Sequence, residues 1–234
     1  MLSIVLPCYN PPEHWEARIL SEYQTLQARI PEPLELIVVN DGSRQGVHEA
    51  QVAVLKDNIP GFRYLHYPVN RGKGYAIRHG MQSAAGDLLM YTDVDFPYAT
   101  DSTLEIYRQL KTGACDVAVG VKDLHYYRNI PRARRIISRT LRWLVRLFLR
   151  MPVTDTQCGL KGFRSAVLPL FLSTTINRYL FDLEFLKYCF RNGKFRVTAI
   201  PVKLKEGVVF RQMNYRILVP ELINFVRVSF KNRE

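Results

Sequence analysis

Leu88-Leu89-Met90-Tyr91-Thr92-Asp93-Val94-Asp95 is a short, mostly apolar run that ends in two aspartates one residue apart. The apolar part is typical of a buried strand, and carboxylates belong at the end of such a strand, where solvent or a ligand can reach them. Along an extended backbone, Asp93 and Asp95 would point to the same side. Two carboxylates this close favour a hard divalent cation, Mg²⁺ or Mn²⁺, that carries a phosphorylated substrate. A plain polar turn is the alternative, because the D-x-D motif is too short to exclude it.

Strands and helices alternate on both sides of this stretch. Further strands are predicted at residues 2–7, 34–40, 62–66, 116–121 and 195–204. Helices are predicted from a proline in the first turn to about residue 28, from 74 to 84, and at 102–111, 131–150 and 179–191, with one more near the carboxyl terminus. This alternation predicts an α/β fold with an open, mostly parallel, twisted sheet and helices on both faces. Ligands of such sheets bind at the carboxyl ends of the strands, where polar residues 9–13, 41–43 and 93–95 all fall.

The composition agrees with a globular protein that has an anionic partner. The chain has 234 residues, 47% of them hydrophobic, which is enough for one large domain or two small ones. A net charge of +12 indicates an anionic partner, such as nucleic acid, nucleotide phosphates or an anionic membrane surface. The four scattered cysteines and the absence of a signal-peptide pattern predict a reduced, cytosolic protein. No apolar run approaches the roughly 20 residues that a membrane-spanning helix needs.

Asn70-Arg71-Gly72-Lys73-Gly74 indicates a loop that holds phosphates. Its glycines permit close backbone approach, and two cations, Arg71 and Lys73, stand beside the amino terminus of a predicted helix. The spacing is neither that of a Walker loop nor G-x-G-x-x-G. A flexible loop with solvated cations is the alternative, and the position just before the acidic strand favours the phosphate role.

The order of these motifs resembles glycosyltransferase family 2. The matching segments are Val5 to Asn10, Val38 to Ser43, Asn70 to Gly74 and Asp93 to Asp95. Later, Asp155 to Lys161 and Asn177 to Glu184 resemble the dolichyl-phosphate glucosyltransferase branch, which is related to the dolichyl-phosphate mannose synthases. The resemblance implies a GT-A fold, a nucleotide-sugar donor and an inverting transfer. It also implies one domain over residues 1–234, with a nucleotide-sugar-binding half (1–121) and a half that faces acceptor and membrane (122–234).

The resemblance further assigns site residues. Base and ribose would be held by Pro7, Tyr9, Glu13 and Asp41; diphosphate and metal would face Asp93 and Asp95. The chain departs from the pattern at Phe96-Pro97-Tyr98, where mannose synthases have a polar residue able to join the metal shell. It departs again at Val121-Lys122, which stands in place of Ser-Arg and makes Lys122 a weaker anion ligand than arginine. The amino-terminal membrane helix of the eukaryotic glucosyltransferases is also missing from the sequence.

Residues 131–150 predict an amphipathic helix. One stripe is apolar (Ile137, Leu141, Leu144, Phe148), and a basic stripe lies opposite (Arg135, Arg139, Arg142, Arg146). With Trp143 on its flank, this pattern is typical of an interfacial membrane helix; a helix docked on the sheet with a solvated basic face, or a nucleic-acid contact, are the alternatives. Arg134 falls nearer the apolar side, one turn before Ser138, and needs an anionic partner there. A lipid phosphate is one such partner, and the resemblance places acceptor-phosphate ligands at this spacing.

Other candidates come from the last third of the chain. Asp155 precedes a glycine in a predicted loop near the donor, and Asp182 lies near a helix start, where the helix dipole favours a carboxylate. Either could serve as a general base for a hydroxyl acceptor. Lys122 and Arg211 join Arg134 and Ser138 as predicted ligands of the acceptor phosphate. The last helix, with Leu218, Leu222, Phe225 and Val226 on one side, predicts either a cover for the core or a second interfacial surface.

Together these features predict a metal-dependent hexosyltransferase that acts at a membrane surface. The expected donor is UDP-glucose and the expected acceptor a polyprenyl or dolichyl phosphate. We expect a peripheral protein on the cytoplasmic face of an anionic membrane. A membrane-protein partner is possible, and no nucleic-acid partner is expected. The alternatives are a transferase that uses a hydroxyl acceptor on a glycan or lipid, and a non-catalytic nucleotide-sugar or nucleic-acid binder.

Overall fold

A seven-stranded sheet forms the centre of the protein, seen in a computed structural model that describes residues 1–122, 132–149, 151–153, 155–206, 208 and 217–230. The strands are β1 (Leu2–Cys8), β2 (Leu34–Asp41), β3 (Phe62–Tyr67), β4 (Leu88–Tyr91), β5 (Val117–Lys122), β6 (Lys161–Arg164) and β7 (Val197–Val202). Their order across the sheet is β3-β2-β1-β4-β6-β5-β7, and only β6 runs antiparallel to its neighbours. The open, mostly parallel sheet that the sequence predicts is confirmed.

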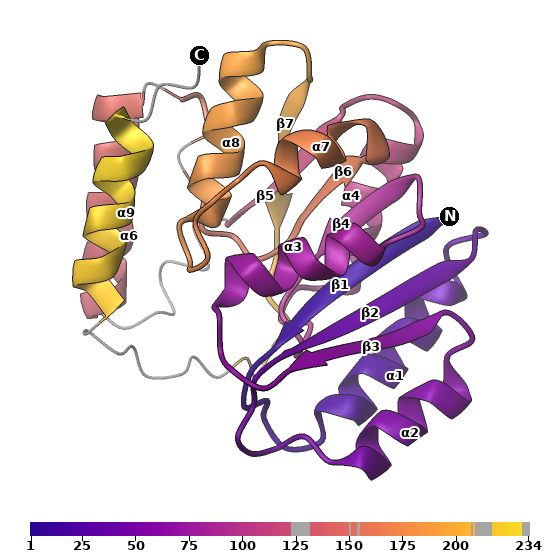
Figure 1. The fold of residues 1–234 in the computed structure, drawn as a ribbon. Helices are drawn as coiled ribbons and strands as arrows, with labels where there is room; N and C mark the ends of the chain where they lie inside the picture. Colours follow the sequence, from indigo (N-terminus) through magenta and orange to yellow (C-terminus); the bar gives the residue numbers. More distant parts are fainter. Residues whose placement is uncertain (123–131, 150, 154, 207, 209–216, 231–234) are drawn as a thin grey trace.

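Helices cover both faces of this sheet (Figure 1). On one face, α1 (Trp15–Gln27), α2 (Glu49–Asn58) and α4 (Thr100–Lys111) pack into one apolar cluster; on the other, α3 (Lys73–Ser83), α7 (Leu168–Leu172) and α8 (Phe181–Asn192) form a second. A short turn of helix, η2 (Ser165–Val167), precedes α7. Strands β1, β2 and β4 are almost continuously buried, because a parallel strand covered on both faces has no solvent-exposed side.

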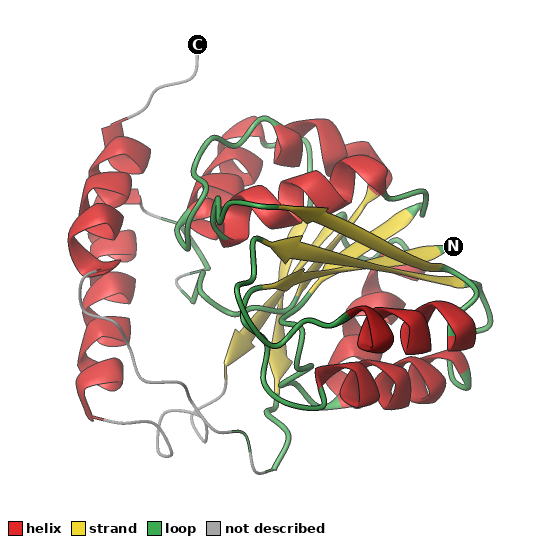
Figure 2. Ribbon diagram, turned by 60° about the horizontal axis from the view of Figure 1, so that its bottom comes forward, coloured by secondary structure: helices red, strands yellow, loops and turns green. Residues whose placement is uncertain are grey.

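Two further helices stand beside the α8 end of the molecule. They are α6 (Arg132–Leu144), continued by the π-helical turn η1 (Val145–Leu149), and α9 (Leu218–Phe230), and they lie side by side in both views (Figures 1 and 2). The rings of Phe148 and Phe225 meet edge to face with centroids 6.2 Å apart, and Val145, Phe225 and Val228 are buried against the second cluster. Among the helices that the structure describes, none has the length and hydropathy to cross a membrane.

Three local predictions are wrong. Strand β4 ends at Tyr91, and the amide of Phe96 donates to the carbonyl oxygen of Asp93 (3.0 Å), so a turn replaces the extended alternation expected for Asp93 and Asp95. Helix α1 begins at Trp15, after the prolines rather than at them. The basic stripe expected opposite the apolar one on the 131–150 helix is incomplete, because Arg142 is only half exposed and lines the same cavity as Ile137 and Leu141.

Candidate active site

A large cavity of about 1710 Å³ opens at the carboxyl ends of β1, β2, β4 and β5. Its polar floor contains most of the residues that the sequence singles out there: Pro7, Tyr9, Asp41, Lys73, Asp93, Asp95, Lys122 and Asp155. Its opposite wall comes from α6 and α9. Parallel strands that end together therefore bring these scattered motifs to one place, as the topology predicts.

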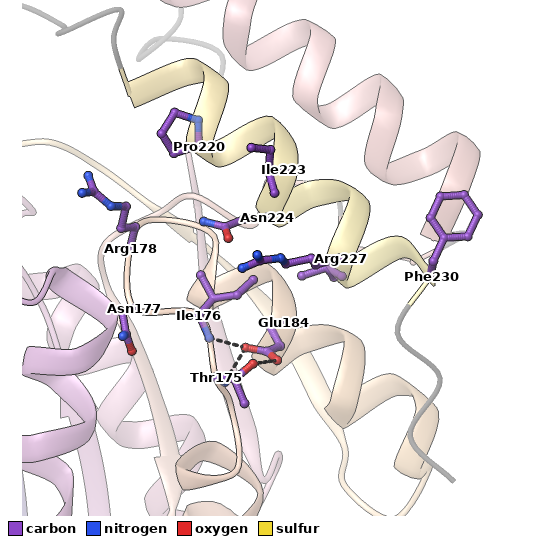
Figure 3. Close-up of a pocket in the computed structure, with 11 residues that line it drawn as sticks. Thr175, Ile176, Asn177, Arg178, Glu184, Pro220, Ile223, Asn224, Arg227 and Phe230 are labelled. Carbon is purple, nitrogen blue, oxygen red and sulfur yellow. Dashed lines mark hydrogen bonds between the residues drawn. The ribbon is translucent and has the colours of Figure 1, made fainter.

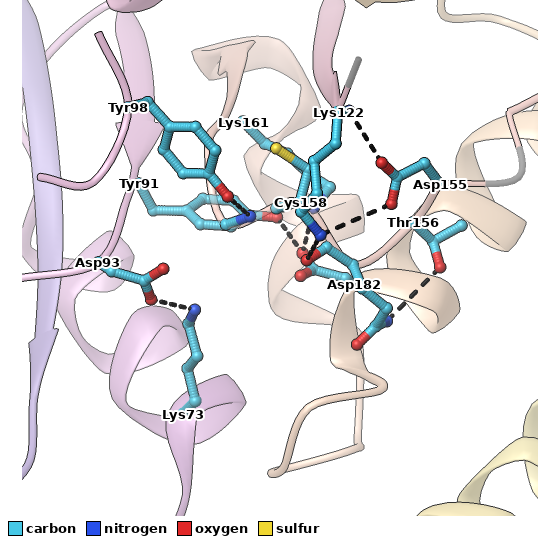
Figure 4. A network of polar contacts seen from close by, with 12 residues as sticks. Lys73, Tyr91, Asp93, Tyr98, Lys122, Asp155, Thr156, Cys158, Lys161 and Asp182 are labelled. Atoms are coloured by element: carbon cyan, nitrogen blue, oxygen red, sulfur yellow. Dashed lines mark hydrogen bonds and ion pairs between the residues drawn. The ribbon is translucent and has the colours of Figure 1, made fainter. Parts of the chain in front are cut away.

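Asp93 and Lys73 form an ion pair on the floor of this cavity (Figure 4). Burial would raise the pKa of Asp93, but Lys73, with Lys122 and Lys161 further away, lowers it instead. Burial would likewise lower the pKa of Lys73, and the Asp93 carboxylate outweighs it. Asp95 behaves differently, because burial and the negative charge of Asp93 both raise its pKa. The two aspartates therefore repel each other, and Lys73 neutralises only one of them.

This arrangement fits a divalent cation. Two carboxylates whose mutual repulsion is only partly relieved supply the oxygen ligands that Mg²⁺ and Mn²⁺ prefer, and such ions take the rest of their shell from phosphates and water. In the described part of the chain, no third histidine, cysteine or acidic residue completes a metal-binding cluster. Phe96 follows the pair and has a left-handed backbone conformation, with φ of 44°. Its side chain is buried and offers no metal ligand.

The Asp41 side chain holds the loop of residues 70–74, which the sequence predicts to bind phosphates. Its carboxylate accepts hydrogen bonds from the backbone amides of Arg71 (2.7 Å) and Gly72 (2.9 Å) and from the Asn70 side chain (2.9 Å). Gly72 adopts φ of 102°, and an added Cβ would come within 2.5 Å of the Asn177 carbonyl oxygen. Asp41 therefore lies at the cavity, as predicted, with its oxygens already committed to the loop that ends at α3.

Arg71 and Glu13 do not join the residues that line the cavity. The Arg71 guanidinium donates to the Tyr75 hydroxyl (2.6 Å) and lies 4.8 Å from the centroid of its ring. Glu13 is exposed, and its neighbour His14, with φ of 57°, lines the cavity instead. The sequence shows which residues stand near a strand end but not which way the turn aims each side chain.

Lys122 and Asp155 close the next part of the floor. The carboxylate of Asp155 accepts the Lys122 backbone amide (2.8 Å) and lies 3.7 Å from its ammonium group, which donates to the carbonyl oxygen of Gln157 (3.0 Å). The same loop carries Gly159, whose amide donates to the Tyr98 hydroxyl (2.9 Å). A Cβ at Gly159 would lie 2.5 Å from an Asp93 carboxylate oxygen, so only glycine permits this approach.

Asp182 lies beneath the cavity rather than in its lining. Its carboxylate pairs with the fully buried Lys161 (3.1 Å) and accepts a hydrogen bond from the Tyr91 hydroxyl (Figure 4). Burial raises the pKa of Asp182, although Lys161 opposes this. The ammonium group of Lys161 also donates to the carbonyl oxygen of Cys158, so this buried pair supports the loop that carries Gly159.

The wall opposite the acidic pair is largely apolar. It is formed by Ile137, Leu141 and Leu144 of α6 and by Leu218, Leu222 and Phe225 of α9, with Ile217 just before it. Ser138, a predicted ligand of the acceptor phosphate, also lines this wall. The side chain of Arg134 and the whole of Arg211 lie outside the described residues.

Some cavity residues were missed by the sequence reasoning. Arg18 and Glu22 come from successive turns of α1, and Arg18 is close enough to lower the pKa of Asp95. Glu22 is buried and pairs with Lys205, which follows β7. Polar residues on or next to the otherwise apolar buried face of α1 were the available signal. Arg142 of α6 also lines the cavity.

Comparison with known proteins gives consistent matches. The sequence profile described as Glycosyl transferase family 2 matches residues 3–169. Glycosyltransferase AglD from Haloferax volcanii is 33% identical over 206 residues, which are 86% of this chain and 32% of that protein. The dolichyl-phosphate beta-glucosyltransferases of Drosophila melanogaster and Homo sapiens are 31% and 30% identical, each over 88% of this chain and 67% of the relative. The chain thus spans about a third of AglD and about two thirds of these glucosyltransferases.

Solved structures show the same fold at low sequence identity. Glucosyl-3-phosphoglycerate synthase from Mycobacterium tuberculosis, in complex with Mg²⁺ and UDP, superposes with a TM-score of 0.69 at 15% identity, over 100% of this chain and 81% of that one. Mannosyl-3-phosphoglycerate synthase from Rubrobacter xylanophilus gives a TM-score of 0.70 at 17% identity, over 98% and 72%. The predicted GT-A architecture is confirmed by this likeness.

Proposed function

Because this chain belongs to glycosyl transferase family 2, we propose that it transfers glucose from UDP-glucose to a polyprenyl or dolichyl phosphate. One observation carries the proposal: a single cavity joins the acidic pair Asp93 and Asp95 to an apolar wall built by two amphipathic helices. The acidic pair suits the metal-bound diphosphate of a nucleotide sugar. A lipid phosphate needs its phosphate near this site and its hydrocarbon chain against the apolar wall. The relatives named for dolichyl-phosphate glucosyl transfer support this choice of acceptor.

At the donor end, the chain supplies binding and charge. Asp93 and Asp95 would hold the divalent cation, which supplies electrostatic stabilisation of the leaving diphosphate when bound. Lys73 lies at the amino terminus of α3, where its charge and the helix dipole both favour a phosphate. A cation held by the acidic pair would compete with Lys73 for Asp93, so the Lys73 ammonium group would be available to the diphosphate.

At the acceptor end, the geometry favours a phosphate over a hydroxyl. A lipid phosphate is already anionic at neutral pH and needs no strong general base, whereas a hydroxyl does. Asp182 does not line the cavity, and Asp155 is engaged by the backbone and ammonium group of Lys122. Neither predicted base is therefore poised to take a proton, while Lys122, Arg142 and Ser138 line the path to the apolar wall.

We place the reaction at a membrane surface. Exposed apolar side chains gather on the two helices: Ile136, Trp143, Leu147 and Phe148 on α6 and η1, and Leu218, Val219, Leu222, Ile223, Val226 and Phe230 on α9. We call this set the paired-helix apolar surface. With a net charge of +12, such a surface suits the interface of an anionic bilayer, and we expect the cytoplasmic face, whose leaflet carries anionic lipids.

A transfer assay tests the proposal directly. Purified protein is incubated with UDP- and GDP-sugars, Mn²⁺ or Mg²⁺ and a short polyprenyl phosphate, and the lipid products are identified by mass spectrometry. We expect a hexosyl-phospholipid from UDP-glucose only when the divalent cation is present. Transfer to a hydroxyl-bearing glycan or lipid in place of the polyprenyl phosphate would overturn the choice of acceptor.

A further inference from the structure

A second cavity, of about 700 Å³, lies between α9 and the loop that precedes α8 (Figure 3). Its lining comes from residues 175–178 of the loop, Glu184 of α8, and Pro220, Ile223, Asn224, Arg227, Val228 and Phe230 of α9. The volume suits a small ligand or a lipid headgroup. Of the residues that line it, only Arg178 also lines the large cavity at the carboxyl ends of the strands, so the two cavities share one edge.

The charge in this cavity is positive and uncompensated. Arg227 reaches from α9 toward the loop at Ile176 and makes no hydrogen bond or ion pair with any residue that the structure describes (Figure 3). The one carboxylate in the lining, Glu184, is fully engaged: it accepts from both Thr175 donors (2.7 and 2.9 Å), the Ile176 amide (2.8 Å) and the Tyr188 hydroxyl (2.7 Å). The cavity therefore offers a guanidinium group to an anion.

The loop wall is already fixed in place. From the side opposite Glu184, the buried Arg78 donates to the Ile176 carbonyl oxygen (2.8 Å) and to the Thr174 hydroxyl (3.1 Å). The Asn177 carbonyl oxygen in turn accepts the Gly74 amide at the start of α3 (2.8 Å). A wall held from both sides needs little reorganisation when a ligand arrives, which lowers the cost of binding.

The α9 side of the cavity is apolar and continues onto the paired-helix apolar surface. Ile223 and Phe230 belong to both, and Phe230 is 74% exposed. An inorganic anion gains nothing from such a rim, whereas an anion that carries hydrocarbon chains does. We propose that this cavity binds the headgroup of an anionic phospholipid, with the phosphate at Arg227 and the acyl chains along Ile223 and Phe230. This site is separate from the proposed acceptor site, and its occupation needs no transfer reaction.

Titration of the full chain in bilayer-free solution tests the site. The probe is dihexanoyl phosphatidylglycerol below its micelle-forming concentration, followed by calorimetry without nucleotide sugar or metal. We expect saturable binding that Arg227→Gln weakens about five- to tenfold, the value of a charge-assisted contact at a partly exposed site. Arg139→Gln, which removes an equally exposed guanidinium outside both cavities, should leave the affinity unchanged.

Two further probes separate the sources of the anion. Phe230→Ser should weaken binding of the phospholipid but not of glycerol phosphate, because only the former reaches the apolar rim. Inorganic phosphate that binds as tightly as the phospholipid would overturn the lipid assignment, and so would equal binding of dihexanoyl phosphatidylcholine. A loss in Arg139→Gln as large as in Arg227→Gln would show general attraction to a basic protein. The transferase proposal is untouched by any of these results.

Discussion

At the scale of single residues, the repulsion between Asp93 and Asp95 is the feature that most needs a ligand. We predict that Asp93→Asn and Asp95→Asn each abolish metal-dependent binding of UDP-glucose, because each removes one of the two carboxylates at the site. Asp57→Asn, an exposed substitution on α2, is the matched control and should bind normally. Calorimetric titration with UDP-glucose and Mn²⁺ measures the effect, and undiminished affinity in both site variants would refute the metal assignment.

The effect of Asp182→Asn distinguishes a general base from a residue that supports the fold. Because it pairs with the fully buried Lys161, Asp182→Asn leaves a buried ammonium group without its counter-ion, which costs about 3–5 kcal/mol. We predict a lowered melting temperature for Asp182→Asn and partial recovery in the double variant with Lys161→Met, measured by thermal unfolding. A general base would behave in the opposite way, with normal stability and a rate loss of about 10²–10⁴-fold in the transfer assay.

Sequence reasoning predicted which residues lie at the site, but it did not predict the contacts that each of them makes. Asp41 and Asp93 were predicted because polar residues that follow parallel strands meet at one edge of the sheet. That Asp41 is engaged by the backbone of the 71–72 loop, and that Arg71 turns to Tyr75, depend on backbone amides and on the glycine at 72, which a pattern of side chains does not show. Gly159, which allows the close approach of Asp93, belongs to a segment that resembles the family, but this role was not predicted.

At the scale of elements, the loop of residues 174–177 is held by a carboxylate of α8. Burial would raise the pKa of Glu184, but the amides and hydroxyls that it accepts from lower it below the ordinary value of 4.5. We predict that Glu184→Gln costs about 1.5–3 kcal/mol of unfolding free energy at neutral pH. A carboxyl with a depressed folded pKa stabilises above its unfolded pKa, so the deficit should shrink as pH falls below 4.5.

Urea unfolding from about pH 7 to about pH 3.5 measures this deficit. Glu13→Gln changes an exposed side chain, serves as the control and should differ little from the parent in unfolding free energy. A deficit for Glu184→Gln that stays constant with pH would show that the side chain acts through its shape and not through its charge.

Most of the strands and helices were predicted from the sequence, but some were missed. The strands β1, β2 and β4 and the helices α1, α3, α4 and α8 lie close to their predicted positions, because their apolar runs are long or bounded by glycine and proline. Helix α2 and strand β6 were missed. Strand β6 has four residues and is antiparallel between parallel neighbours, so its place depends on pairing partners far away in the sequence.

At the scale of the whole molecule, α6 and α9 form one surface although residues 145–217 separate them in the sequence. The sequence predicted an interfacial α6 with an apolar stripe facing a basic one, and left α9 between a core cover and a second interface. Only Phe225 and Val228 of α9 are buried, so the helix presents most of its apolar residues to solvent. The pattern of apolar residues in one helix does not predict this exposure, because the exposure depends on which other elements pack against the helix.

The paired-helix apolar surface leads to a prediction for the intact protein. We expect it to float with anionic liposomes at low salt and to be only partly released as salt rises, because charges are screened within about 8 Å at physiological ionic strength while apolar insertion is not. Trp143→Ser with Leu147→Ser, both more than half exposed, should remove most of the salt-resistant fraction without loss of folding. Val54→Ser with Val69→Ser removes exposed apolar side chains elsewhere and should change nothing. Equal losses in the two pairs would mean that no particular face meets the membrane, and a protein that stays unbound at low salt would place the two helices against another partner.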